Sequence, residues 1–157
     1  MKQLIPNSKI AHPIWATIPC AVWVGMIASI SFMEAWMKFR APGITLSTGL
    51  EIGKLVFRAL NKMEWLAALT IYASLLFSGD ISRRRNIPVI LVTIFLALQT
   101  FWLLPRLSSR ADKIIAGLDV APSYLHVIFI VFEVGKVALL ATFIIIVTSR
   151  TIRNQTT

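Results

Sequence analysis

The stretch Leu125–Val147, LHVIFIVFEVGKVALLATFIIIV, decides the fold class of this chain. Beyond His126 at its start, its only ionisable residues are Glu133 and Lys136. The stretch is long enough to cross the hydrocarbon core of a bilayer, which takes about 20 residues of α-helix. We therefore predict that it is a transmembrane helix.

Three further stretches have a similar length and apolar character. Residues 14–32 and 87–104 hold no charge, and residues 55–77 are amphipathic at first and apolar later. Four spans nearly exhaust the chain, so we expect one membrane domain over 1–157 and no soluble domain. The predicted fold is all-α, an integral membrane four-helix bundle built from two tandem helical hairpins. The predicted spans are residues 14–37, 50–77, 87–104 and 122–148.

The composition agrees with a membrane protein that has basic edges. Of the 157 residues, 57% are hydrophobic and 15% are charged, whereas a soluble domain has roughly 45–50% and about 25%. Lys and Arg number 16 against 7 Asp and Glu, which gives a formal charge of +9. On so apolar a chain this excess favours a bilayer, and not nucleic acid, as the partner.

The distribution of the basic residues predicts the orientation. An even number of spans places both termini on one side, together with the dense run Arg83–Arg85 in a short loop. Because cytoplasmic loops carry the excess of Lys and Arg, we predict that both termini are cytoplasmic, in a bacterial inner membrane.

Two similar tetrapeptides suggest an internal repeat. Residues 49–52 read GLEI and residues 117–120 read GLDV, each in a connection predicted to lie outside. Glu64 follows the first acid by thirteen residues, and Glu133 follows the second by fourteen. These matches predict a duplicated two-helix unit.

Local signals predict where the connections end. Thr48 and Glu51 have the spacing of a capping box, which would start the second helix before the membrane. Ser109 is expected to begin a short helix that ends at Gly117, and Pro122 is expected in the first turn of the last helix.

Ionisable side chains inside a membrane span are costly and mark candidate functional sites. At 100° per residue, Glu64 lies about 140° from a polar stripe on the same helix. That stripe, which we expect to face headgroups or water, consists of Glu51, Lys54, Arg58 and Lys62. The candidate ligand- or proton-binding residues are Glu34, Glu64, Gln99, His126, Glu133 and Lys136.

The first interpretation of these residues is an outward-facing polar pocket in the outer half of the bundle. It would bind a metal, a proton or a small ligand, with Glu64, His126 and Glu133 as the metal ligands if a metal binds. The chain has no Glu-x-x-His pair, which weakens the metal interpretation. This interpretation leaves open both an enzymatic activity and the identity of any cofactor.

Two alternatives stay open. In the first, Lys136 pairs with Glu64 or Glu133 and Gln99 bonds across helices, so that these groups only fix helix packing in an accessory subunit of a membrane complex. The ion pair is the favoured interpretation for Lys136, but two carboxylates and one lysine leave a surplus acid. In the second, a homo-oligomer of the chain transports a small solute.

The same residues resemble an uncharacterised bacterial family of four-span membrane proteins, and the plan is similar to transmembrane protein 205-like and anthrone-oxygenase-like proteins. The resemblance covers most of the chain and implies a fold, but no activity. Where those families commonly have Pro after a Glu-Ala step, this chain has Trp36. The residues that carry the resemblance are Glu34-Ala35, Lys38-Phe39, Ala41–Thr45, Gly49-Leu50, Ile52-Gly53, Val56-Phe57, Ala59–Asn61, Glu64, Leu104-Pro105, Arg110–Asp112, Ile114–Gly117, Leu125-His126, Glu133 and Lys136.

Overall fold

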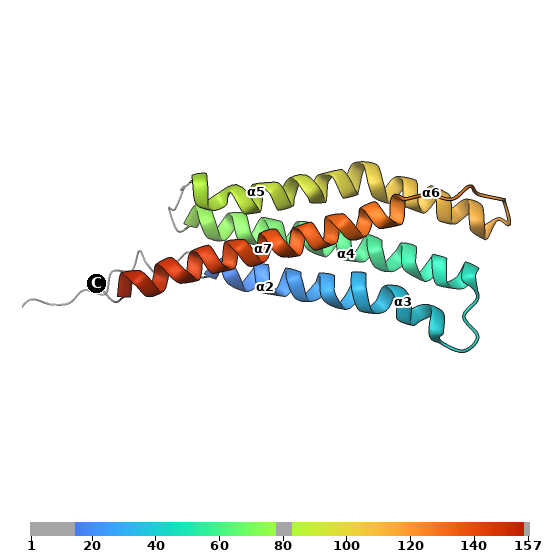
Figure 1. The fold of residues 1–157 in the computed structure, drawn as a ribbon, viewed down its shortest axis with the longest axis horizontal. Coiled ribbons are helices and arrows are strands. Elements are labelled where there is room, and N and C mark those ends of the chain that lie inside the picture. The colour runs from blue at the N-terminus through green and yellow to red at the C-terminus, as the bar shows by residue number, and fades with distance from the viewer. Residues whose placement is uncertain (1–14, 78–82, 156–157) are drawn as a thin grey trace, which may run out of the picture.

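The fold of the chain is an elongated bundle of helices, seen in a computed structural model that describes residues 15–77 and 83–155 (Figure 1). All regular structure in these two ranges is helical, which confirms the predicted all-α class. The predicted start of the first span at residue 14, and the turn at 78–82, lie outside the described residues.

The helices form four rods, two of which change their winding along their length. The first rod consists of α2 (Thr17–Met26), the π-helical η1 (Ile27–Glu34), α3 (Ala35–Met37) and the 3₁₀-helical η2 (Lys38–Arg40). The second rod is α4 (Leu46–Phe77). The third consists of α5 (Arg83–Leu98), the π-helical η3 (Gln99–Leu103) and α6 (Leu104–Ile115), and the fourth is α7 (Leu125–Gln155).

Three of the rods are long and apolar enough to cross a membrane. They cover Thr17–Arg40, Arg85–Ile115 and Leu125–Arg153. The rod α4 is as long as these, but the charged residues in its first half lower its apolarity, so its membrane span stays a prediction.

Two local predictions from the sequence are wrong. The short helix expected to begin at Ser109 is the end of the third rod, which continues through Pro105. The π-helical turn before Pro105 is wider than an α-helical one, which relieves the clash that a proline makes with the preceding turn. In the fourth rod, α7 begins at Leu125, after Pro122, and the Leu125 N–H donates to Ser123 Oγ at 3.2 Å.

The second rod also begins earlier than the sequence suggested. It starts at Leu46, and the backbone N–H of Thr48 donates to Thr45 Oγ1 at 3.2 Å. Thr45 therefore caps a first turn that the capping-box pattern assigned to Thr48. The tetrapeptide 49–52 is consequently helical, whereas its counterpart 117–120 lies in the connection before α7.

The four rods pack in a ring. The helix α2 lies against α4 and α7, α7 lies against α5, and α4 closes the ring against α5 and α6. Inside the ring, the half of the bundle nearer to the C-terminal end of α7 has a close-packed apolar core. This core includes Trp23, Ile71, Leu96 and Phe143. Outward-facing side chains are also apolar, as Phe77 is 85% exposed. An apolar exterior suits a lipid environment.

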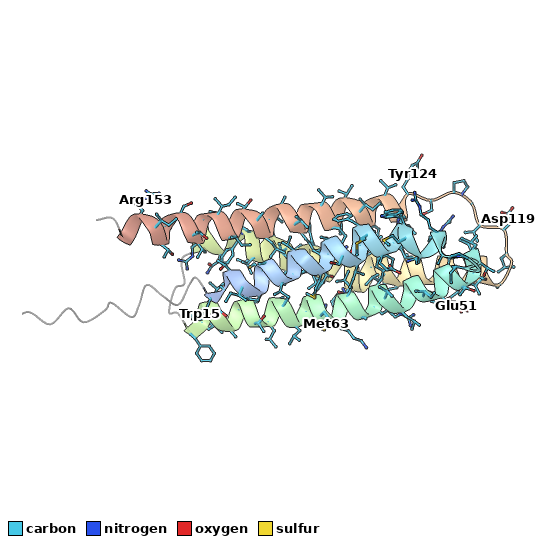
Figure 2. All side chains as sticks on the ribbon, turned by 90° about the horizontal axis from the view of Figure 1, so that it is seen from below. Trp15, Glu51, Met63, Asp119, Tyr124 and Arg153 are labelled. Carbon is cyan, nitrogen blue, oxygen red and sulfur yellow. The ribbon has the colours of Figure 1, made fainter. Side chains whose placement is uncertain are left out.

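The connections 41–45 and 116–124 lie at one end of the bundle, opposite the C-terminal end of α7 (Figure 1). Figure 2 shows Asp119 and Tyr124 at that end and Arg153 at the other. Each connection contains a glycine with positive φ, 81° at Gly43 and 74° at Gly117, a conformation that L side chains rarely adopt. We refer to this end as the connection end.

Candidate functional site

Five buried side chains from all four rods meet inside the bundle. We call them the acid–lysine cluster; they are Trp23, Glu64, Gln99, Glu133 and Lys136. Glu133 and Lys136 are 0% exposed and Glu64 is 2% exposed. Helical spacing places Glu133 and Lys136 on one face of α7, since residues three apart are neighbours on a helix.

Hydrogen bonds join the cluster across the helices. Lys136 Nζ bonds to Glu64 Oε1 and lies 3.1 Å from Glu133 Oε1. Trp23 Nε1 donates to Glu64 Oε1 at 2.8 Å, and Gln99 Nε2 donates to Glu133 Oε1 at 2.8 Å. One oxygen of each carboxylate therefore receives two donors, and Lys136 serves both acids.

The cluster has more acid than base. If both carboxylates were ionised, the two negative charges would face one ammonium, and a net charge would be buried without compensation. Two of its oxygens, Glu133 Oε2 and Gln99 Oε1, are buried and accept no hydrogen bond. A buried polar atom without a partner is costly, so these two acceptors indicate a missing donor.

A cavity of about 500 Å³ lies next to the cluster. We call it the basic pocket. Its charged or titratable lining residues are Lys38, Lys54, Arg58, Lys62 and His126. Neutral polar groups at its wall include Asn61 and Thr100, which hydrogen-bond to each other at 3.0 Å.

The pocket and the cluster form successive layers along the bundle. On α4 the pocket residues end at Lys62 and the cluster begins at Glu64; on the third rod Thr100 lines the pocket and Gln99 belongs to the cluster. In each of these rods the pocket lies on the side of the connection end. The pocket is therefore nearer to that end than the cluster is.

The structure brings four of the six predicted site residues together and separates the other two. Glu64, Gln99, Glu133 and Lys136 are in the cluster. His126 instead lines the pocket, where its ring stacks on that of Phe129 with centroids 6.5 Å apart. Glu34 forms an ion pair with Lys38 at 3.3 Å, one turn along the first rod.

The three residues predicted as metal ligands do not form one site. His126 is separated from Glu133 by two helical turns and lies in the pocket layer. Within residues 15–77 and 83–155, no group of three or more His, Cys, Asp or Glu side chains is placed to hold a metal ion.

Sequence reasoning missed one member of the cluster and did not predict that the polar stripe borders a pocket. Trp23 was not among the candidate site residues, because an indole in a membrane span is usually a packing or interfacial residue. Arg58 and Lys62 are exposed, as expected for a stripe that faces headgroups or water, and together with Lys54 they also line the pocket. Their spacing of four residues shows a shared face, but it does not show that this face borders a cavity.

The winding of the third rod contributes to the site. Gln99 opens the π-helical turn η3, and Glu34 closes the π-helical η1 of the first rod. π-helical turns are rare in proteins overall, but those that occur are often found at functional sites. They change the direction of side chains within an otherwise regular helix.

Comparisons with protein-family models, curated proteins and solved structures find no match to this chain. The resemblance to the four-span family therefore stays a prediction, and function is argued from the chain's own residues.

Proposed function

We propose that this chain is a four-span inner-membrane protein of two tandem helical hairpins that holds one exchangeable proton in the acid–lysine cluster. The proton neutralises the surplus acid, so that Glu64 and Lys136 form an ion pair and Glu133 is the protonated acid. The sequence allowed a metal, a proton or a small molecule at this site. Of these, only the proton requires no coordinating side chain beyond those already in the cluster.

The observation that carries this proposal is the pair of buried acceptors, Glu133 Oε2 and Gln99 Oε1. The Gln99 amide already donates to the other oxygen of Glu133. A carboxylic acid and an amide can bond to each other twice, once through each donor. A proton on Glu133 Oε2 supplies the donor that both acceptors lack, and it removes the net charge at the same time.

The test is infrared spectroscopy of the purified protein in a bilayer at neutral pH. Exposed carboxyl groups are ionised at that pH, so the wild type is expected to show one band of a protonated carboxylic acid, shifted by exchange into D₂O. Glu133→Gln should abolish the band, and Glu51→Gln at an exposed carboxyl group should leave it. Absence of the band from the folded wild-type protein contradicts the proposal.

Two matched variants locate the proton. Gln99→Leu removes the amide partner of Glu133 and should shift the band, whereas Trp23→Phe, which removes a donor to Glu64, should leave its position unchanged. The reverse pattern would assign the proton to Glu64 and refute its placement on Glu133.

A second candidate function is that of an accessory subunit whose cluster only fixes helix packing. The observation that favours it is the complete burial of Lys136 between two acids from different rods. This candidate predicts that both carboxylates are ionised, so that no protonated band appears, and that a partner protein remains bound in mild detergent.

The proposed orientation has its own test. In a Cys20→Ser background, single cysteines at Asp119 and Arg150 lie at opposite ends of the bundle. A membrane-impermeant thiol reagent added to intact cells should label position 119 and not position 150. Labelling of position 150 alone would show that the termini face outward.

A further inference from the structure

The basic pocket has an uneven balance of charge. Four cationic side chains line it, and none of its lining residues is acidic. Lys54 is paired with Asp112, and Lys38 is paired with Glu34, from outside the lining. Arg58 Nη2 donates only to a neutral group, Ser108 Oγ, at 3.0 Å.

Two of these cations, the exposed side chains of Arg58 and Lys62, have no carboxylate partner among the described residues. Lys54, Arg58 and Lys62 are also spaced four residues apart on α4, an arrangement in which like charges repel and destabilise a helix. An anion between Arg58 and Lys62 would remove this repulsion.

Much of the remaining pocket wall is apolar. The rings of Phe57 and Phe129 lie 5.0 Å apart at their centroids, and Leu50, Leu104 and Leu107 add aliphatic surface. A volume of about 500 Å³ falls within the usual range for small-molecule pockets. The wall therefore fits a ligand that has one charged end and an apolar body.

Two glycines on α4 allow the first rod to form the wall on that side. A Cβ at Gly49 would lie 2.3 Å from the ring of Phe39, and a Cβ at Gly53 would lie 2.9 Å from Lys38 Nζ. The absence of these side chains lets Lys38 and Phe39 approach the helix and enclose the cavity. The shape of the pocket thus depends on residues that carry no charge.

We propose that the basic pocket binds an anionic amphiphile, that is, a phosphate or carboxylate head group on a single alkyl chain. The head group lies between Arg58 and Lys62, where charge-assisted hydrogen bonds hold it. The chain runs along Phe57 and Phe129. This site is separate from the acid–lysine cluster and does not depend on the proton placed there.

The test is calorimetric titration of the full chain in phosphatidylcholine nanodiscs with octyl phosphate, after subtraction of empty nanodiscs. The wild type is expected to show saturable binding. Inorganic phosphate and octyltrimethylammonium should bind at least about tenfold more weakly, because the first lacks the alkyl chain and the second has the wrong charge. Absence of saturable octyl phosphate binding, or equal binding of inorganic phosphate, would overturn the proposal.

Charge-removing variants separate the pocket from general attraction by a basic protein. Arg58→Gln with Lys62→Gln should weaken octyl phosphate binding by about tenfold or more, since each charge-assisted bond contributes about that factor. The matched control, Arg150→Gln with Arg153→Gln, removes two charges at the other end and should bind like the wild type. Equal weakening in both pairs would contradict a specific site.

Two more variants serve as controls. The first tests the pocket without the double variant, which could misfold, and the second tests whether octyl phosphate binding depends on the acid–lysine cluster. Gly53→Ala keeps every charge but displaces the Lys38 ammonium, and it should also weaken binding. Glu133→Gln should bind octyl phosphate normally, which separates failure of this site from failure of the proton site. Unchanged binding in Gly53→Ala, or lost binding in Glu133→Gln, would refute the placement of the ligand in this pocket.

Discussion

The strongest test of the acid–lysine cluster is the combined removal of its two negative charges. In the variant Glu64→Gln with Glu133→Gln, the ammonium of Lys136 stays fully buried and has no countercharge. Leaving one partner of a buried ion pair uncompensated destabilises a fold by about 3–5 kcal/mol. We expect a loss of that size in the free energy of unfolding.

Each single substitution should have a much smaller effect. Glu133→Gln keeps an oxygen that accepts from Lys136 and gains an amide donor for Gln99, so it imitates the protonated acid. Glu64→Gln leaves Glu133 free to ionise and take over the pairing with Lys136. We expect about 1 kcal/mol for each, which makes the two substitutions strongly non-additive, as contacting residues of one network are.

Denaturant titration in detergent micelles, extrapolated to zero denaturant, measures these free energies. Adding Lys136→Met to the double variant should recover at least about half of the loss, because it removes the unpaired charge. Glu51→Gln on the exposed surface of α4 is the matched control and should change stability by less than about 0.5 kcal/mol. A double variant that costs no more than the sum of its singles would refute the reasoning.

Three further predictions concern packing and accessibility. Gly49→Ala should destabilise the fold by about 1–3 kcal/mol because its Cβ meets an aromatic ring, whereas Gly25→Ala, which meets nothing within 4 Å, should be neutral or slightly stabilising in the same unfolding assay. Trp23→Phe should lower the free energy of unfolding by about 1–3 kcal/mol, because it removes a donor to a buried acid. Trp65→Phe is the control, since the Trp65 indole donates at an exposed site, and it should lower this free energy by less. Equal losses in the two variants would contradict a structural role of the Trp23 hydrogen bond in the cluster. Cys20 is fully buried, so a thiol reagent should modify it only after denaturation, as mass spectrometry would show.

Much of the architecture follows from periodicity and hydropathy. The helical class and the three helices long and apolar enough to cross a membrane can be predicted from the sequence, because a run of about 20 apolar residues has few other stable structures. The helix ends were less predictable. Pro105 normally signals a boundary, yet the π-helical turn at 99–103 lets the rod continue past it to Ile115.

The candidate site was predictable in most of its members and not in its arrangement. The cost of burying charge in a membrane singled out Glu64, Glu133 and Lys136, and the structure joins them. The same reasoning grouped His126 with them, because residues seven apart share a helix face. A shared face does not imply a shared depth, and His126 lies two turns away in the basic pocket.

The sequence by itself determined that this chain is helical and suited to a membrane, and that its candidate site residues include more acidic side chains than lysines. Those properties depend on composition and spacing along one helix. Only the tertiary structure decided which groups meet: that one lysine serves two acids, that Gln99 and Glu133 leave two acceptors without donors, and that Arg58 and Lys62 face a cavity. The physical reason is that hydrogen bonds and ion pairs depend on distances of about 3 Å between different helices, which the periodicity of a single helix does not fix.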